Sequence, residues 1–172
     1  MRELLPNAVR IGLMVNPHNT NVDVVTKDVA AAASAIGAEI VVVQASDSPG
    51  IEAAFAALVR QKTDALLVGA DTFFYFRRLQ LATLATRHAI PAVYNVRDFA
   101  EAGGLMTYGS SLPEMFRQVA IYTGRVLKGA KPADLPVVQS TRFELVINLP
   151  TARALGLEVP PTLLARADEV IE

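Results

Sequence analysis

The feature that most constrains the fold is a regular alternation of short apolar runs and amphipathic segments along the first 95 residues. The apolar runs are typical of strands and comprise residues 9–15, 39–45, 65–69 and 90–95. The intervening segments, about 22–36, 49–61 and 72–88, carry apolar side chains at helical spacing. A β-α-β-α-β-α-β order with short links predicts a parallel sheet with helices on both faces and right-handed crossovers. We therefore expect an α/β fold of the three-layer α/β/α, Rossmann-like (flavodoxin-like) kind.

The alternation changes after residue 95. A helical turn is expected at 96–102, and the pair Gly103-Gly104 leads into a short strand at 105–109. A longer helix then begins at Ser110 or Ser111 and ends near Leu127. The remaining expected elements are a turn-rich connector at 128–136, extended segments at 137–138 and 142–148, and short helices at 151–155 and 161–165.

Composition excludes several classes of protein. The chain has 172 residues, of which 52% are hydrophobic and 19% charged, which suits one domain with a large core and excludes disorder. A net charge of −1 gives no reason to expect nucleic acid or an anionic membrane as a partner. No apolar run approaches a membrane span, so direct membrane insertion is not expected. Without cysteine, disulfides, thiolate metal sites and cysteine nucleophiles are excluded.

The usual motifs of enzymes and cofactor sites are also missing. Neither G-x-G-x-x-G nor G-x-x-x-x-G-K-[ST] occurs, so the backbone cradles for dinucleotides and nucleotides are absent. G-x-S-x-G is absent too. His18 and His88 lie far apart in the pattern, so a two-histidine metal site is not expected. No candidate nucleophile has a neighbouring base, and we therefore expect ligand binding without a cofactor, a metal or catalysis.

Polar and aromatic side chains gather where the expected strands end. Ligands of open α/β sheets sit beyond the carboxyl ends of the strands, so this rim is the candidate binding site. Aromatic rings would supply contact area, Arg97 could clamp a carboxylate, and Asp71 could hold an amine or a hydroxyl. The candidate ligand-binding residues are Asn16, His18, Asn19, Asp71, Thr72, Phe73, Phe74, Tyr75, Tyr94, Asn95 and Arg97.

Each of these residues also has a purely structural interpretation. Asp71 or Thr72 could cap the next helix, followed by aromatics that only pack. Tyr94 could be a core residue. Arg97 could form a surface ion pair with Asp98 or Glu101.

Several longer segments carry a family resemblance that covers essentially the whole chain. They are R-E-L-L-P-N-A-V-R-I-G-L-M-V-N-P (2–17), D-A-L-L-V-G-A-D (64–71), A-I-P-A-V-Y (89–94), F-A-E-A-G-G-L-M-T-Y-G (99–109), L-K-G-A-K-P-A-D-L-P (127–136) and F-E-L-V-I-N-L-P-T-A-R-A-L-G-L (143–157). On these segments the chain resembles the periplasmic substrate-binding proteins of ABC transporters, in particular the branch associated with tryptophan and tyrosine. The resemblance implies one lobe of a type I periplasmic-binding-protein fold.

The resemblance also implies a domain organisation. Residues 1–102 would form the second, ligand-binding lobe, residues 103–136 the hinge and a segment returning to the first lobe, and residues 137–172 the return strand and C-terminal helices. The opening residues 1–6 resemble the last turn of a helix, and the matched family starts earlier, so we expect a fragment that lacks most of the first lobe.

Function follows from the same resemblance. The implied role is the solute-binding component of an ABC importer in the periplasm, with ABC permease subunits and a small carboxylate or amino-acid-like ligand, aromatic ones included, as partners. The alternative is the effector-binding domain of a transcription regulator, which would carry a DNA-binding module upstream. A small α/β enzyme is disfavoured because no nucleophile–base pair is found. A homodimer of the fragment is also expected, because Met115, Phe116, Val119 and Tyr122 share a helix face without an obvious partner.

Overall fold

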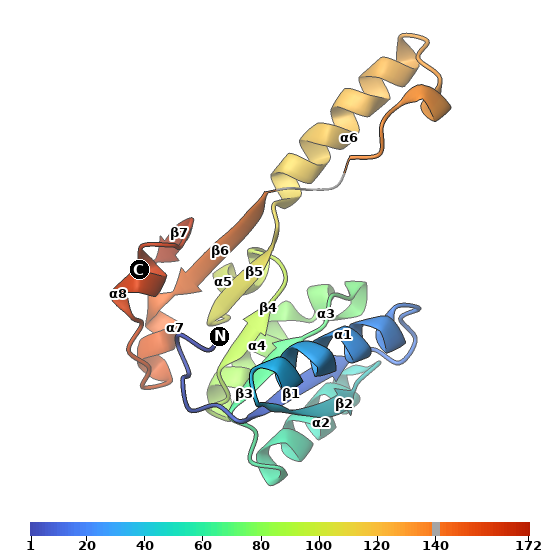
Figure 1. Cartoon of the computed structure of the whole chain (residues 1–172). Helices are drawn as coiled ribbons and strands as arrows, with labels where there is room; N and C mark the ends of the chain where they lie inside the picture. The colour runs from blue at the N-terminus through green and yellow to red at the C-terminus, as the bar shows by residue number, and fades with distance from the viewer. Residues whose placement is uncertain (139–141) are drawn as a thin grey trace.

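The computed structural model describes residues 1–138 and 142–172 (Figure 1). Within these residues the strands form one sheet of seven, in the order β2-β1-β3-β4-β5-β6-β7. The strands are β1 (Arg10–Val15), β2 (Glu39–Gln44), β3 (Ala65–Val68), β4 (Ala92–Tyr94), β5 (Met106–Ser110), β6 (Phe143–Asn148) and β7 (Glu169–Ile171). Strands β1 to β5 run parallel, β6 is antiparallel to β5, and β7 is parallel to β6. The predicted α/β fold with a mainly parallel sheet is confirmed.

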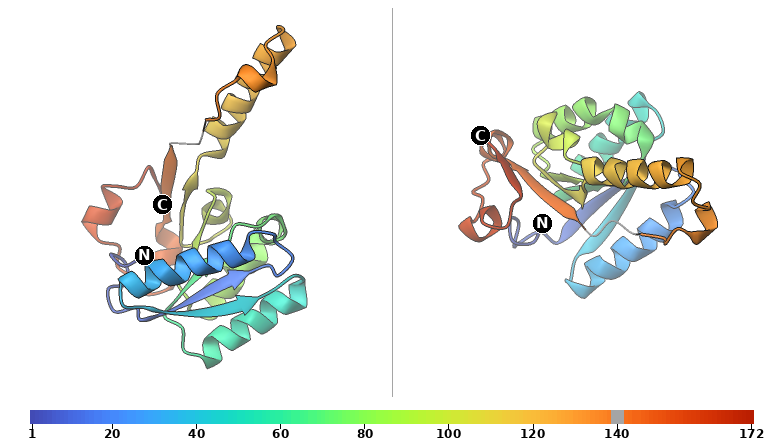
Figure 2. Two further views of the ribbon diagram at one scale, coloured as in Figure 1. Left: turned by 45° about the vertical axis from the view of Figure 1, so that its right-hand side comes forward. Right: turned by 90° about the horizontal axis from the view of Figure 1, so that it is seen from above.

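Helices connect the parallel strands on both faces of the sheet. They are α1 (Val22–Ala35), α2 (Ser48–Arg60), α3 (Thr72–Phe76), α4 (Arg78–Arg87), α5 (Asp98–Glu101), α6 (Leu112–Leu127), the 3-10 turn η1 (Pro132–Asp134), α7 (Leu149–Ala154) and α8 (Pro161–Leu164). Figure 2 shows α1 and α2 on opposite faces. The single helix expected at 72–88 is two helices, because Arg77 (φ −102°, ψ 13°) leaves the helical region between α3 and α4.

The core has two parts, one on each face of the sheet. The larger one packs α2, α3 and α4 against the sheet around Phe55, Phe74 and Leu81, all fully buried. The smaller one joins β5 and β6 to the opening turn, α7 and α8 around Leu4 and Ile147. Burial of these side chains is the main term that stabilises the fold.

Helix α6 stands apart from both cores. It projects from the sheet at the end of β5, and none of its described residues is buried (Figures 1 and 2). Its Tyr122 hydroxyl donates a hydrogen bond to the Pro136 carbonyl oxygen at 2.7 Å, which holds the returning connector beside the helix. Of segment 103–136, β5 is paired within the sheet, and the projecting part begins after Ser110. Of segment 137–172, residues 139–141 lie outside the described residues.

A close backbone crossing marks the point where the chain leaves the sheet. A Cβ atom at Gly109 would lie 1.8 Å from the Asn95 carbonyl oxygen. The chain can therefore pass the end of β4 only with glycine at this position.

Among the described residues, no helix is long and apolar enough to cross a membrane.

Candidate functional site

The carboxyl ends of β1, β3 and β4 meet at one edge of the sheet. Met14 pairs with Val68 and Leu67 pairs with Val93, all in parallel register. The loops that follow these strands therefore open on the same side. The parallel register confirms that these strand ends share one edge of the sheet, and the site there stays a prediction. The predicted side chains divide into three groups.

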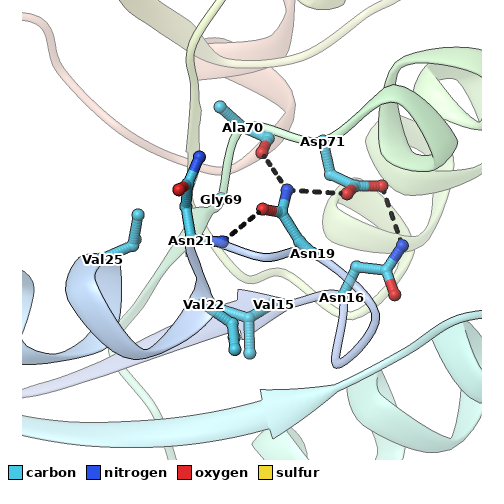
Figure 3. Close-up of a pocket in the computed structure, with 9 residues that line it drawn as sticks. All are labelled: Val15, Asn16, Asn19, Asn21, Val22, Val25, Gly69, Ala70 and Asp71. Carbon is cyan, nitrogen blue, oxygen red and sulfur yellow. Dashed lines mark hydrogen bonds between the residues drawn. The ribbon is translucent and has the colours of Figure 1, made fainter.

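Asp71 is the centre of the first group. Its Oδ1 accepts hydrogen bonds from the Phe73 amide at 2.8 Å and from Asn16 Nδ2 at 3.0 Å. Its Oδ2 accepts one from Asn19 Nδ2 at 2.9 Å (Figure 3). Asp71 is the N-cap of α3, so the capping interpretation is correct, yet the cap bond occupies only part of the carboxylate.

The two asparagines are held by their own loop. Asn16 Oδ1 accepts from the His18 amide at 3.0 Å, and Asn19 Oδ1 accepts from the Asn21 amide at 2.9 Å. These bonds settle which end of each amide is the acceptor, and both NH2 groups are directed at Asp71 (Figure 3). The hollow between them has a volume of about 20 Å³, which is room for one water molecule and not for an amino acid.

The same contacts set the ionisation of Asp71. Partial burial opposes the charge, but hydrogen bonds from Asn16, Asn19 and the amides of Phe73 and Phe74 outweigh it and hold the pKa of Asp71 below its ordinary value. The side chain is therefore a fixed negative charge at neutral pH.

A larger cleft opens beside Asp71 and has a volume of about 600 Å³. It lies between the carboxyl edge of the sheet and the foot of α6. Its lining residues are Asn19, Ala70, Asp71, Thr72, Tyr75, Phe76, Asn95, Val96, Leu112 and Phe116. Five residues predicted from the sequence therefore line one cleft: Asn19, Asp71, Thr72, Tyr75 and Asn95.

The sequence interpretation did not include five apolar residues that line this cleft, of which Ala70 directly precedes the predicted Asp71. Phe76 directly follows the predicted aromatic residues and is 72% exposed. The unbroken run of aromatic residues was therefore a signal that could have identified it. Val96 directly follows the predicted Asn95. Leu112 and Phe116 come from α6, and no local pattern connects that helix with the strand ends.

A second group of predicted residues lies in the core. Phe74 is fully buried, and Phe73 is half-buried against the same cluster. Tyr94 is buried and stacked on Phe99 with ring centroids 4.5 Å apart, and burial raises the pKa of its hydroxyl. Within the described residues that hydroxyl has no hydrogen-bond partner. The packing interpretation is correct for Tyr94, because the last strand residue points inward and Asn95 is the next to face out.

Arg97 and His18 form the third group, and neither lines the cleft. Arg97 donates from Nε and Nη2 to the two carboxylate oxygens of Glu169 at 2.9 and 2.7 Å, and from Nη1 to Glu101. The hydrogen bonds to Glu169 contribute most to raising the pKa of Arg97, and the hydrogen bond to Glu101 adds to this effect. The structure therefore directs the guanidinium at β7, and one of the two surface pairs considered from the sequence, that with Glu101, is present. His18 is exposed on its loop.

Tyr75 is fixed by a neighbouring carboxylate. Its hydroxyl donates to Asp98 Oδ2 at 2.5 Å, and this hydrogen bond raises the pKa of Tyr75. The Arg78 guanidinium lies 5.0 Å from the centre of the Tyr75 ring. Between these contacts the ring is held at the cleft wall.

Among the residues that the structure describes, no group of three histidine, aspartate or glutamate side chains could hold a metal ion.

Comparison with known proteins gives one consistent family. Residues 1–171 match the family model described as ABC transporter substrate binding protein. A curated relative, the tyrosine-binding protein of Clostridioides difficile (strain R20291), is 24% identical over 158 residues, which are 92% of this chain and 46% of that protein.

Two solved structures are similar over nearly the whole chain. The ABC domain in complex with L-Trp from Streptococcus pneumonia is 25% identical with a TM-score of 0.89, covering 99% of this chain and 57% of that one. A conserved domain protein from Vibrio cholerae is 26% identical with a TM-score of 0.89, covering 98% and 57%. A LacI family transcriptional regulator from Bifidobacterium animalis, at 13% identity and a TM-score of 0.60 over 84% of this chain and 56% of its own, shares the fold alone.

The chain thus spans about half the length of the relatives it matches. The family is one of substrate-binding proteins and not of enzymes, which agrees with the expectation of ligand binding without catalysis. With a family match over residues 1–171, this chain belongs to the ABC transporter substrate-binding protein family.

Proposed function

We propose that this chain is the ligand-binding lobe of an ABC importer's solute receptor and takes a small amino-acid-like ligand at the cleft beside Asp71. The observation that carries the proposal is the cleft itself, which joins a held carboxylate to exposed aromatic rings at the carboxyl edge of the sheet. Its volume lies within the range of about 300–1,000 Å³ that is usual for small-molecule sites. The names of the relatives, one tyrosine-binding and one solved with L-Trp, support an aromatic amino acid.

Each lining residue has a definite part in this proposal. Asp71 pairs with the ligand's amine, and Tyr75, Phe76 and Phe116 contact its apolar body. Asn95 supplies a neutral polar contact at the opposite wall. Arg97 has no part in the proposed site, because Glu169 and Glu101 occupy its guanidinium.

The same proposal assigns the rest of the receptor. Residues 1–102 form one lobe together with β5, β6 and β7, and the part of 103–136 that lies beyond Ser110 reaches a companion lobe. Residues 137–172 carry the chain back to this sheet. The exposed apolar face of α6 supports this assignment, since Met115, Phe116 and Val119 are 42%, 66% and 60% exposed and a companion lobe would cover them. The complete receptor would work in the periplasm and deliver its ligand to ABC permease subunits.

The test is a thermal-shift and calorimetric screen of this chain with the twenty amino acids. A ligand at ten times its Kd stabilises the folded state by about 1.4 kcal/mol, which for a chain of this length raises Tm by roughly 3–6 °C. We expect tryptophan, tyrosine or phenylalanine to give the largest shift. The proposal would be refuted if tryptophan, tyrosine and phenylalanine raised Tm no more than serine or glutamate does.

A further inference from the structure

The charge of the cleft is one-sided. Of the described residues that line it, Asp71 alone is ionisable as an acid or base near neutral pH, and it is negative. The nearby guanidinium groups are engaged elsewhere: Arg97 with Glu169, and Arg78 with the Tyr75 carbonyl oxygen at 3.2 Å. Among the described residues, no cationic side chain lines the cleft to pair with a ligand carboxylate.

Asp71 lines the cleft, and its side chain is only partly buried there. A carboxylate has about four lone-pair positions, two on each oxygen. Oδ1 accepts from Phe73 and Asn16, Oδ2 accepts from Asn19, and the Phe74 amide also contributes to the same carboxylate. All of these donors are neutral, so the carboxylate keeps its negative charge and attracts a cationic N–H donor that enters the cleft.

The apolar side of the cleft is built from two separate elements. Tyr75 and Phe76 of α3 form an edge-to-face pair with centroids 5.6 Å apart. Phe116 of α6 is 66% exposed, and it lines the same cleft with Leu112 and Val96. Such rings suit a flat apolar group inserted between the sheet edge and α6.

From this distribution we propose that the lobe recognises the ammonium group and the aromatic body of its ligand and does not recognise the carboxylate. This inference rests on the proposed function, because it assigns the parts of that ligand. It has a specific consequence: an aromatic amine without a carboxylate binds this chain about as well as the corresponding amino acid.

The experiment compares three indole ligands that differ in one charged group each. Amide resonances of the chain are titrated with L-tryptophan, tryptamine and indole-3-propionate. We expect tryptamine to bind within about threefold of L-tryptophan, and indole-3-propionate at least about tenfold more weakly, as loss of a charge-assisted contact implies. Two results would overturn this inference and leave the proposed function intact. In the first, L-tryptophan binds and tryptamine does not. In the second, indole-3-propionate binds with the same affinity as tryptamine. Failure of all three ligands would overturn it together with the proposed function.

Variants identify the groups responsible. Asp71→Asn keeps a capping side chain and removes the charge, and it should weaken tryptamine at least about tenfold. Asp47→Asn is the matched control, because Asp47 caps α2 through the Gly50 amide at 2.7 Å and lies outside the cleft. Equal tryptamine affinity of the two variants would contradict the ammonium contact.

A second pair of variants remains informative even if Asp71→Asn folds poorly. Phe116→Ala removes an exposed ring and should weaken L-tryptophan and tryptamine by the same factor, about three- to tenfold. Leu127→Ala, at the far end of α6 and 82% exposed, should leave both affinities unchanged. An effect of Phe116→Ala no larger than that of Leu127→Ala would overturn the aromatic contact.

Discussion

Replacement of Asp71 by alanine measures how strongly the candidate site is held together before any ligand binds. The substitution removes the cap of α3, which is worth about 1 kcal/mol. It also removes the acceptors of Asn16 and Asn19, each worth about 0.5–1 kcal/mol because both asparagines are only half-buried and water replaces part of the bond. We expect a loss of about 2–3 kcal/mol in the free energy of unfolding, or roughly 4–12 °C in Tm.

The assay is urea unfolding followed by circular dichroism, with Asp47→Ala as the control. Asp47 makes one cap bond, to Gly50, and has no asparagine partners, so its removal should cost about 1 kcal/mol. An equal loss in the two variants would show that the asparagine bonds contribute nothing, and would refute this account of the site.

The same comparison has a pH dependence with a definite sign. The pKa of Asp71 is lowered from its ordinary value of 3.8, so the folded state binds its proton more weakly than the unfolded state. Its stabilising contribution is present above pH 4 and is lost as pH falls through the lower folded pKa. The difference in unfolding free energy between wild type and Asp71→Ala should therefore be largest at pH 5–7 and smaller at pH 3. A difference that grows on acidification would contradict the lowered pKa.

Three other outcomes follow from the structure. Arg97→Ala should destabilise the chain by about 1 kcal/mol, because its pair with Glu169 is more than a third exposed, and calorimetry should show unchanged ligand affinity; a tenfold loss of affinity would return Arg97 to the site. Gly109→Ala should cost about 1–3 kcal/mol in urea unfolding, since its Cβ would overlap the Asn95 carbonyl oxygen, and wild-type stability would contradict that crossing. The chain by itself should dimerise at high micromolar concentration through the apolar face of α6, and Val119→Lys should make it monomeric; sedimentation showing a wild-type monomer throughout would count against this.

The fold could be predicted from the sequence because its signals are local. Short apolar runs separated by amphipathic segments determine the β-α order, and chain connectivity then determines that β1 to β4 run parallel. The break at Arg77 was not predictable in the same way, because the segment from Thr72 to Arg87 has an uninterrupted helical composition without glycine or proline. The projection of α6 was partly visible, since its apolar face had no partner within the expected lobe.

The site could be predicted only as far as strand ends determine it. Topology places Asp71 and Asn95 at one edge, and both line the cleft. Side-chain direction is a further step: Tyr94 is a strand residue that points into the core, whereas Asn95 faces out. The contribution of Phe116 required the three-dimensional path of the chain beyond β5, which no spacing in the sequence specifies. Arg97 could not be assigned either, because its partner Glu169 is distant in sequence.

The structural and binding roles of Asp71 support each other. A carboxylate that only caps a helix would be free to turn toward water, whereas here two asparagine amides, themselves fixed by the backbone of their loop, hold it in one orientation. Because that orientation exists before any ligand arrives, the proposed contact with an ammonium group would cost little conformational entropy. The network also keeps the carboxylate ionised, so its charge is available to the ligand across the neutral pH range. The helix cap of α3 thus also holds in one orientation the carboxylate of the proposed site, and the exposed rings of Phe76 and Phe116 line the same cleft.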